Sequence, residues 1–235
     1  MEWRDAPGWL PEGCRVYAVG DVHGCAGRLL GLHTQITRDL AARPVERATL
    51  IHLGDLIDKG EDSAGALDLA LTAPQGVAEV VNLLGNHEDA LLEALAGDRG
   101  ALRDFRDFGG GATLASWGLD PLSDPAEWRI PERHLRLLRA MALTHRLGGY
   151  FFVHGGIRPG VALEAQVRGD LLNIRRTFHD SAAEHGAVIV HGHTPTRDRL
   201  PELRANRINL DTGAVHGGAL SCAVLEARRV AFLAG

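Results

Sequence analysis

The chain has few cysteines, no long apolar run and no surplus of positive charge. Its three cysteines (Cys14, Cys25 and Cys222) are odd in number and form no paired motif, which suits a reducing compartment better than a disulfide framework. No apolar stretch is long enough to span a bilayer, and residues 1–13 lack the basic start and apolar core of a secretory signal. We therefore expect a cytoplasmic protein with no membrane partner.

The charge balance argues against nucleic acid as a partner. The 235 residues carry a net charge of -5, and the pI is near 6.2, which argues against a nucleic-acid-binding protein. Hydrophobic residues make up 45% of the chain and charged residues 23%, as in globular proteins that bury a core. The chain is long enough for a single core of this kind.

Several short apolar segments end in glycine, polar or turn residues, and this pattern predicts buried strands. Six such segments span residues 15–20, 48–54, 77–85, 149–153, 187–190 and 207–210. A closing hairpin is predicted over 219–225 and 230–233, with 226–229 as its turn.

Leucines at helical spacing lie between the first strands, for example over residues 29–40 and 91–95. Alternation of strand and helix predicts βαβ units with parallel strands in the first half. The later strands follow each other more directly, which indicates a mixed sheet or a second sheet packed on the first. Residues 88–146 show helix patterns and no clear strand, so we expect one domain, 1–235, with a helical insert at about 88–146.

Nearly every predicted strand ends in Asp, Asn or His beside glycine, where ligands bind in open α/β sheets. The motifs are Gly-Asp-Val-His-Gly (20–24), Gly-Asp-Leu-Ile-Asp-Lys-Gly (54–60), Gly-Asn-His-Glu (85–88), His-Gly-Gly (154–156), His-Gly-His-Thr (191–194) and Asp-Thr-Gly (211–213). Carboxylate, amide and imidazole donors without thiolate suit Mn, Fe or Zn. Any one motif could be a simple turn or a helix cap, but their repetition at successive strand ends favours a metal centre. Two metals about 3.5–4 Å apart can share a carboxylate and a water and assist an in-line displacement.

These motifs, in this order, resemble those of the calcineurin-like metallophosphoesterases. The resemblance is closest to the phosphoprotein phosphatase branch, with its compact bacterial and bacteriophage Ser/Thr protein phosphatases, and it runs from about Arg15 to Leu225. It implies an α/β fold, a β-sandwich of mixed sheets flanked by helices. It also implies hydrolysis of phosphate monoesters by a water that bridges two divalent metal ions, with manganese expected and iron or zinc as the alternatives.

The resemblance also gives roles to individual residues. His87 would be the general acid for the leaving group, oriented by Asp58. The implied metal ligands are Asp21 and His23 for one ion, Asp55 for both ions, and Asn86, His154 and His193 for the second.

Substrate binding departs from the family pattern at one position. The phosphate would be bound by Arg175 and by Lys59, which stands where the family has a second arginine. Lysine keeps the charge but loses the planar two-pronged contact of arginine. His216, where many relatives have an aromatic residue, either contacts the substrate or caps a loop. His191 either orients a ligand or is an ordinary strand residue.

Three functions are compatible with this reading. The favoured one is a phospho-Ser/Thr protein phosphatase, whose partners are phosphorylated proteins or small phosphoesters. The alternative is a dinucleoside polyphosphate hydrolase of the diadenosine tetraphosphate type, which needs polyphosphate-binding groups outside the metal centre. The arginines of the insert keep that alternative open: Arg99, Arg103, Arg106, Arg129, Arg133, Arg136 and Arg139. An inactive phosphoprotein-binding scaffold is disfavoured, because no expected ligand or acid is missing.

The remaining histidines are expected to be structural. We place His52 in the core, hydrogen-bonded to backbone. The others are expected at the surface: His33, His134, His145, His179 and His185.

Overall fold

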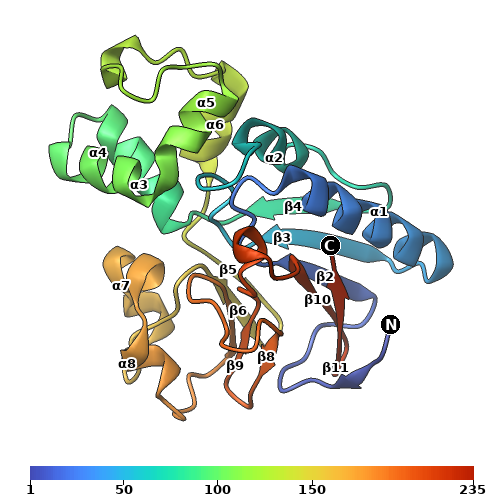
Figure 1. The fold of residues 1–235 in the computed structure, drawn as a ribbon. Coiled ribbons are helices and arrows are strands. Elements are labelled where there is room, and N and C mark those ends of the chain that lie inside the picture. Colours follow the sequence, from blue (N-terminus) through green and yellow to red (C-terminus); the bar gives the residue numbers. More distant parts are fainter.

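Two β-sheets lie face to face in the computed structural model, which describes residues 1–235 (Figure 1). The first sheet has the strand order β1-β11-β10-β2-β3-β4, with β2, β3 and β4 parallel and the other pairs antiparallel. Its strands are β1 (Arg4–Asp5), β2 (Cys14–Val19), β3 (Arg47–His52), β4 (Glu79–Asn82), β10 (Ser221–Glu226) and β11 (Arg229–Ala234).

The second sheet has the order β5-β6-β7-β9-β8. Strands β6, β7 and β9 are parallel, and the two outer pairs are antiparallel. Its strands are β5 (Thr144–Leu147), β6 (Tyr150–Val153), β7 (Val188–His191), β8 (Glu202–Leu203) and β9 (Arg207–Asn209). Both sheets are mixed, so the predicted sandwich of mixed sheets is confirmed.

Alternating side chains of each strand belong to different apolar layers. On β2, Val16 packs in the layer between the sheets, whereas Tyr17 packs under the helices of the first sheet. On β6, Tyr150 joins the middle layer and Phe151 faces outward to a third layer. Successive side chains of a strand point to opposite faces, so each sheet has an inner face against its partner and an outer face for helices.

Helices cover both outer faces. Helices α1 (Ala26–Ala42) and α2 (Ser63–Ala70) pack on the first sheet, and α7 (Arg168–Asn173) and α8 (Arg176–His179) pack on the second (Figure 1). No helix is both long enough and apolar enough to cross a membrane.

The predicted helical insert forms a group of short helices at one end of the sandwich (Figure 1). Its helices are α3 (Asn86–Leu95), α4 (Arg99–Phe105), α5 (Gly111–Ser116) and α6 (Glu132–Ala140), and Arg106–Gly110 joins α4 to α5 through a kink at Gly109. Short 3-10 turns occur at Pro125–Glu127, Leu163–Ala165 and Ala214–His216.

Three details differ from the sequence prediction. Strand β5 begins at Thr144, inside the segment expected to be helical, because its polar residues form a strand only by pairing with β6. The two-residue strands β1 and β8 carry too little pattern to be recognised. Glu226 pairs with Arg229, so the hairpin turn consists of residues 227 and 228 rather than 226–229.

Two of the histidines expected at the surface are buried. His134 is fully buried and contacts Trp117 and Asp68. His33 is 6% exposed, and it lies on the buried stripe of α1 with Leu29, Leu32 and Ile36. That helical spacing was visible in the sequence and predicts burial better than the polarity of imidazole does.

His52 is buried as expected, but its Nδ1 lies 2.7 Å from the side-chain oxygen of Asn82 rather than from backbone. Its ring centre is 5.8 Å from that of His33. Burial lowers the pKa of both imidazoles to about 4. Both rings are therefore neutral near pH 7.

This pair should make stability depend on pH. In the unfolded chain both histidines have the ordinary pKa of 6.5, so they bind protons between about pH 6.5 and 4. In the folded chain the same two histidines stay unprotonated over this range. The free energy of unfolding should therefore fall as the pH falls through this window. In His33→Leu the loss between pH 7 and pH 5 should be smaller by roughly 1–2 kcal/mol. Urea denaturation of metal-free protein at both pH values measures it, and equal losses in the two proteins would contradict it.

Candidate metal centre

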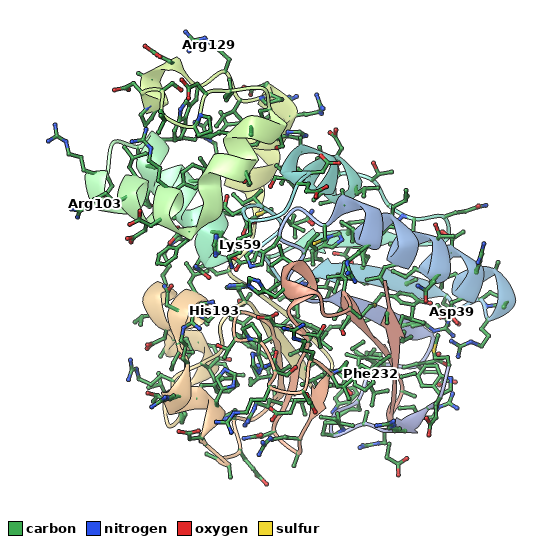
Figure 2. All side chains as sticks on the ribbon, viewed as in Figure 1. Asp39, Lys59, Arg103, Arg129, His193 and Phe232 are labelled. Carbon is green, nitrogen blue, oxygen red and sulfur yellow. The ribbon has the colours of Figure 1, made fainter.

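Polar side chains from both sheets meet where the parallel strands end. Figure 2 shows Lys59, from the loop after β3, close to His193, from the loop after β7, between the insert and the sandwich. Residues far apart in sequence thus reach one place, because both sheets direct strand ends to it.

Two groups of buried donor atoms are close enough to hold metal ions. One consists of His23, Asp55 and His87, and the other of Asp55, His154 and His193. Within each group, the donor atoms all lie within 4.8 Å of one another. Asp55 belongs to both, with Oδ2 3.5 Å from His23 Nε2 and Oδ1 3.4 Å from His154 Nε2. One carboxylate therefore stands between two candidate sites.

Backbone carbonyls fix the orientation of two of these rings. His23 Nδ1 lies 2.8 Å from the carbonyl of Ile57, and His154 Nδ1 lies 2.9 Å from the carbonyl of Leu53. In the neutral ring, Nδ1 donates to the carbonyl, and Nε2 keeps its lone pair facing Asp55. This is the arrangement that metal-bound histidines usually adopt.

Asn86 links the second group. Its side-chain oxygen lies 3.0 Å from His154 Nε2 and 2.8 Å from His193 Nδ1. The Nε2 atom of His193 is buried without a partner. Asn86 can therefore add an oxygen donor to the two imidazoles and Asp55.

The protonation states fit a cation as well. Burial lowers the pKa of His23 and of His193 to about 3, so both rings are neutral and able to coordinate near pH 7. For His154, burial opposes the charge, but the Asp55 carboxylate outweighs it and raises the pKa to about 10. A proton on His154 and a metal ion thus compete for the same place beside Asp55.

Asp21 lies behind this arrangement and belongs to neither group of three. Its two carboxylate oxygens each accept the backbone N–H of His193 at 3.1 Å. Burial and the neighbouring carboxylate of Asp211 raise its pKa well above the usual value. A divalent cation would relieve the repulsion between these two acids. The charge of Asp21 therefore suits a metal ligand, although its oxygens lie outside the two groups of close donor atoms.

The loops that carry these residues adopt a left-handed backbone conformation, which is unfavourable for residues with a side chain. Five such residues lie in the motifs: His23, Asp55, Asp58, Lys59 and His193, with φ between 44° and 71°. Glycine is required beside two of them. A Cβ on Gly85 would collide with the carboxylate of Asp55, and one on Gly192 with that of Asp21.

His87 is held by a relay that begins in the insert. Thr113 on α5 donates a hydrogen bond to Asp58 Oδ1 at 2.6 Å, and Asp58 Oδ2 lies 2.7 Å from His87 Nδ1. Burial disfavours a charged His87, but the carboxylates of Asp55 and Asp58 outweigh it and raise the pKa. The other ring nitrogen, Nε2, lies 3.8 Å from Asp55 Oδ2, so the ring faces the centre.

Glu88 fixes the loop that carries Asp55. Its fully buried carboxylate accepts backbone N–H groups of Asp55 (2.9 Å), Leu56 (2.7 Å), Ile57 (3.2 Å) and Gly85 (3.0 Å). Burial and the Asp55 charge raise the pKa of Glu88 to about 7, whereas these four N–H donors favour the carboxylate. Glu88 thus joins two of the sequence motifs into one unit.

A small cavity of about 60 Å³ opens onto the centre. Lys59 Nζ lies 2.9 Å from His23 Nε2, so a positive charge points at the first metal group. Asp21, Asp58 and His154 lie buried behind the wall. The cavity is lined by the other predicted site residues: His23, Asp55, Lys59, Asn86, His87, Arg175, His193 and His216.

Three residues at this place were not identified from the sequence. Asp211 lines the cavity, and the Asp-Thr-Gly motif after its strand was a visible signal. Glu88 stood in the Gly-Asn-His-Glu motif but had no assigned role. Thr113 gave no signal, because it reaches Asp58 only through the folded insert. His191 lies at the end of β7 and packs against Phe178 with ring centres 5.0 Å apart.

Glu88→Gln should loosen the centre. The amide has one acceptor oxygen and presents N–H groups to backbone N–H donors, so at least one buried donor loses its partner. We expect the free energy of unfolding to drop by roughly 1–3 kcal/mol, with weaker Mn²⁺ binding. Glu93→Gln, exposed on the same helix α3, is the matched control and should change neither. Urea denaturation and Mn²⁺ titration calorimetry test this, and unchanged Mn²⁺ affinity in Glu88→Gln would contradict it.

Comparison with known proteins agrees with this geometry. Asymmetrical bis(5'-nucleosyl)-tetraphosphatase PrpE of Anoxybacillus flavithermus is 27% identical over 86% of this chain and 87% of its own. Serine/threonine-protein phosphatase 1 of Salmonella typhimurium is 28% identical over 90% of this chain and 92% of its own. Further bis(5'-nucleosyl)-tetraphosphatases are similar, among them the symmetrical enzyme of Nitrosomonas europaea, 29% identical over 81% of this chain and 70% of its own.

A solved structure shows the same fold. The cold-active protein-tyrosine phosphatase of a Shewanella species superposes with a TM-score of 0.61 at 16% identity, over 97% of this chain and 83% of its own. The calcineurin-like phosphoesterase family matches residues 14–230, nearly the whole chain. The chain therefore belongs to the calcineurin-like phosphoesterase family and is a metal-dependent phosphoesterase.

Proposed function

We propose that this chain hydrolyses dinucleoside polyphosphates at a two-metal centre. The observation that carries the proposal is Asp55, shared by two groups of buried donors beside a cavity with Lys59 and Arg175. For the substrate, the support comes from the relatives, among which bis(5'-nucleosyl)-tetraphosphatases outnumber protein phosphatases. This reverses the order in which the sequence motifs alone place the two substrates.

The ligand assignment keeps the expected residues. Asp21 and His23 would hold one ion, Asp55 both, and Asn86, His154 and His193 the second; Asp211 stands near enough to Asp21 to bias that site electrostatically. Manganese suits the donor set, as do iron and zinc. When bound, two such ions lower the pKa of a shared water and neutralise phosphate charge.

The proton for the leaving group would come from His87. Its Nδ1 is engaged by Asp58, so the proton to be delivered sits on Nε2, which faces the cavity. The carboxylates of Asp55 and Asp58 raise the pKa of His87, which favours the protonated ring. Asp58 acts as the positioning residue, and Thr113 holds Asp58 in turn.

Phosphate binding would fall to Arg175 and Lys59. Both line the cavity, but only arginine can make two parallel hydrogen bonds to one phosphate. Lys59 acts as a point charge near His23. His216 is exposed at the rim of the same cavity and can contact a larger substrate.

The second candidate is hydrolysis of phosphomonoesters, including phospho-Ser/Thr proteins. The similarity to the Salmonella phosphatase covers as much of this chain as the similarity to the tetraphosphatases does. The small cavity also admits a single phosphoryl group. Because the sequence carries every proposed ligand and the proposed acid, an inactive scaffold is the weakest of the three readings.

A substrate panel separates these candidates. On Mn²⁺-loaded protein, kcat/KM should be highest for diadenosine tetraphosphate, lower for p-nitrophenyl phosphate and lowest for a phosphoserine peptide. The panel is read by product chromatography after chelation and metal reloading. A phosphopeptide kcat/KM above that for diadenosine tetraphosphate would overturn the proposed substrate and restore the phosphatase reading.

His87→Asn tests the proton donor. An alkoxide leaving group needs a proton, so turnover of glycerol phosphate should fall by roughly 10²–10⁴-fold. Diadenosine tetraphosphate and p-nitrophenyl phosphate have leaving groups that are stable as anions, so their losses should be smaller. Metal analysis must show unchanged Mn²⁺ content, and equal losses on all three substrates would remove His87 from this role.

A further inference from the structure

A large polar groove lies next to the metal cavity. Its volume is about 890 Å³ and no hydrophobic residue lines it. Helix α8, the loop after β7 and strand β9 form its walls. Arg175 and Pro195 line both the groove and the metal cavity, so the two spaces meet at the arginine proposed to bind phosphate.

Positive charge in this groove is only partly neutralised. Glu202 pairs with Arg204 at 2.8 Å and with Arg207 at 3.0 Å. Arg175, Arg176 and Arg197 are exposed and form no ion pair. Asp180 and Asp198 also line the groove, so its five arginines still outnumber its three carboxylates. Three free guanidinium groups therefore line a path that starts at the metal cavity.

Hydrogen-bonding groups in the groove also lack partners. The hydroxyls of Thr194 and Thr196 and the Nε2 atom of His179 are buried without a hydrogen bond. An unpaired buried polar atom costs stability unless something satisfies it. Thr194 directly follows the proposed ligand His193, so a ligand with oxygen acceptors that extends from the metals would meet these groups.

The space on the other side of the centre has the opposite charge. The cavity beside His87 is lined by Asp89, Glu93 and Asp104 and by the rings of Phe105 and Phe108. Asp89 pairs with Arg168, but Glu93 and Asp104 form no ion pair, so an anionic chain is disfavoured there relative to the arginine groove. Two arginines of the insert, Arg103 and Arg129, lie at its outer rim, away from Lys59 and His193 (Figure 2), and a third, Arg133, pairs with Asp68.

We propose that this groove is a second anion subsite, which binds the further phosphates of an oligophosphate chain while one phosphate lies at the metals. The inference rests on the proposed function and names the part of the substrate that the groove takes. Arg175 holds the phosphate at the junction, and Arg176, Arg197 and Thr196 hold the next ones. Arginine is suited to this task because its fork matches two phosphate oxygens.

The test uses inhibition of p-nitrophenyl phosphate hydrolysis, with free Mn²⁺ kept in excess. Tripolyphosphate should inhibit the protein more strongly than orthophosphate. In Arg176→Ala/Arg197→Ala, the tripolyphosphate inhibition constant should rise by roughly tenfold or more, because each lost charged hydrogen bond is worth about tenfold. The orthophosphate inhibition constant and kcat/KM for p-nitrophenyl phosphate should stay within about twofold, since neither reaches beyond the metal cavity.

The double variant Arg103→Ala/Arg129→Ala is the control. It removes the same charge from the outer rim of the insert and should leave tripolyphosphate inhibition unchanged. If tripolyphosphate inhibition weakened equally in the two double variants, the effect would come from net charge alone, and the subsite would be overturned. An unchanged tripolyphosphate inhibition constant in the groove variant would also overturn the subsite. This holds even if that variant binds an acidic phosphopeptide more weakly. If the protein fails to hydrolyse diadenosine tetraphosphate but the groove variant selectively loses tripolyphosphate binding, the proposed function fails and the subsite stands.

Discussion

The shared carboxylate of Asp55 is the contact on which the rest of the site depends. One group of buried imidazoles, from the first sheet, lies near its Oδ2 atom, and the other, from the second sheet, lies near its Oδ1 atom. A lone buried carboxylate in such a place is costly unless cations or hydrogen bonds compensate it. Glu88 supplies rigidity rather than compensation, since it ties the Asp55 loop to the start of α3. The strained backbone at Asp55 persists because this frame over-determines it.

The helical insert contributes contacts to the site itself. Thr113 holds Asp58, and the backbone N–H of Lys59 donates to the carbonyl of Gly109 at the kink between α4 and α5. Asp58 and Lys59 therefore both contact the insert, and Asp58 in turn holds the ring of His87. The second sheet contributes differently, through Arg175 and the groove beyond it. The candidate metal ligands, the Asp58–His87 pair and the groove beyond Arg175 therefore depend on different parts of one fold.

Much of this arrangement could be predicted from the sequence, because strands that end in Asp, Asn or His beside glycine leave a clear local pattern. The pattern indicated the strands and the ligand loops, and the family resemblance implied the His87–Asp58 pair. It could not give β5, whose strand exists only through pairing with β6, or Thr113, which meets Asp58 from 55 residues away. It also misplaced His33, since polarity was weighed above helical spacing. The groove was beyond prediction, because Arg176 and Arg197 become neighbours of one space only after folding.

The most direct test of the central claim is the number and position of the metal ions. Crystals grown with Mn²⁺, measured at the manganese absorption edge, should show two anomalous peaks per chain. One should lie beside His23 and the other beside His154 and His193, with Asp55 between them. Elemental analysis of the same protein should give two ions per chain. A single peak, or two peaks that do not both adjoin Asp55, would contradict the account.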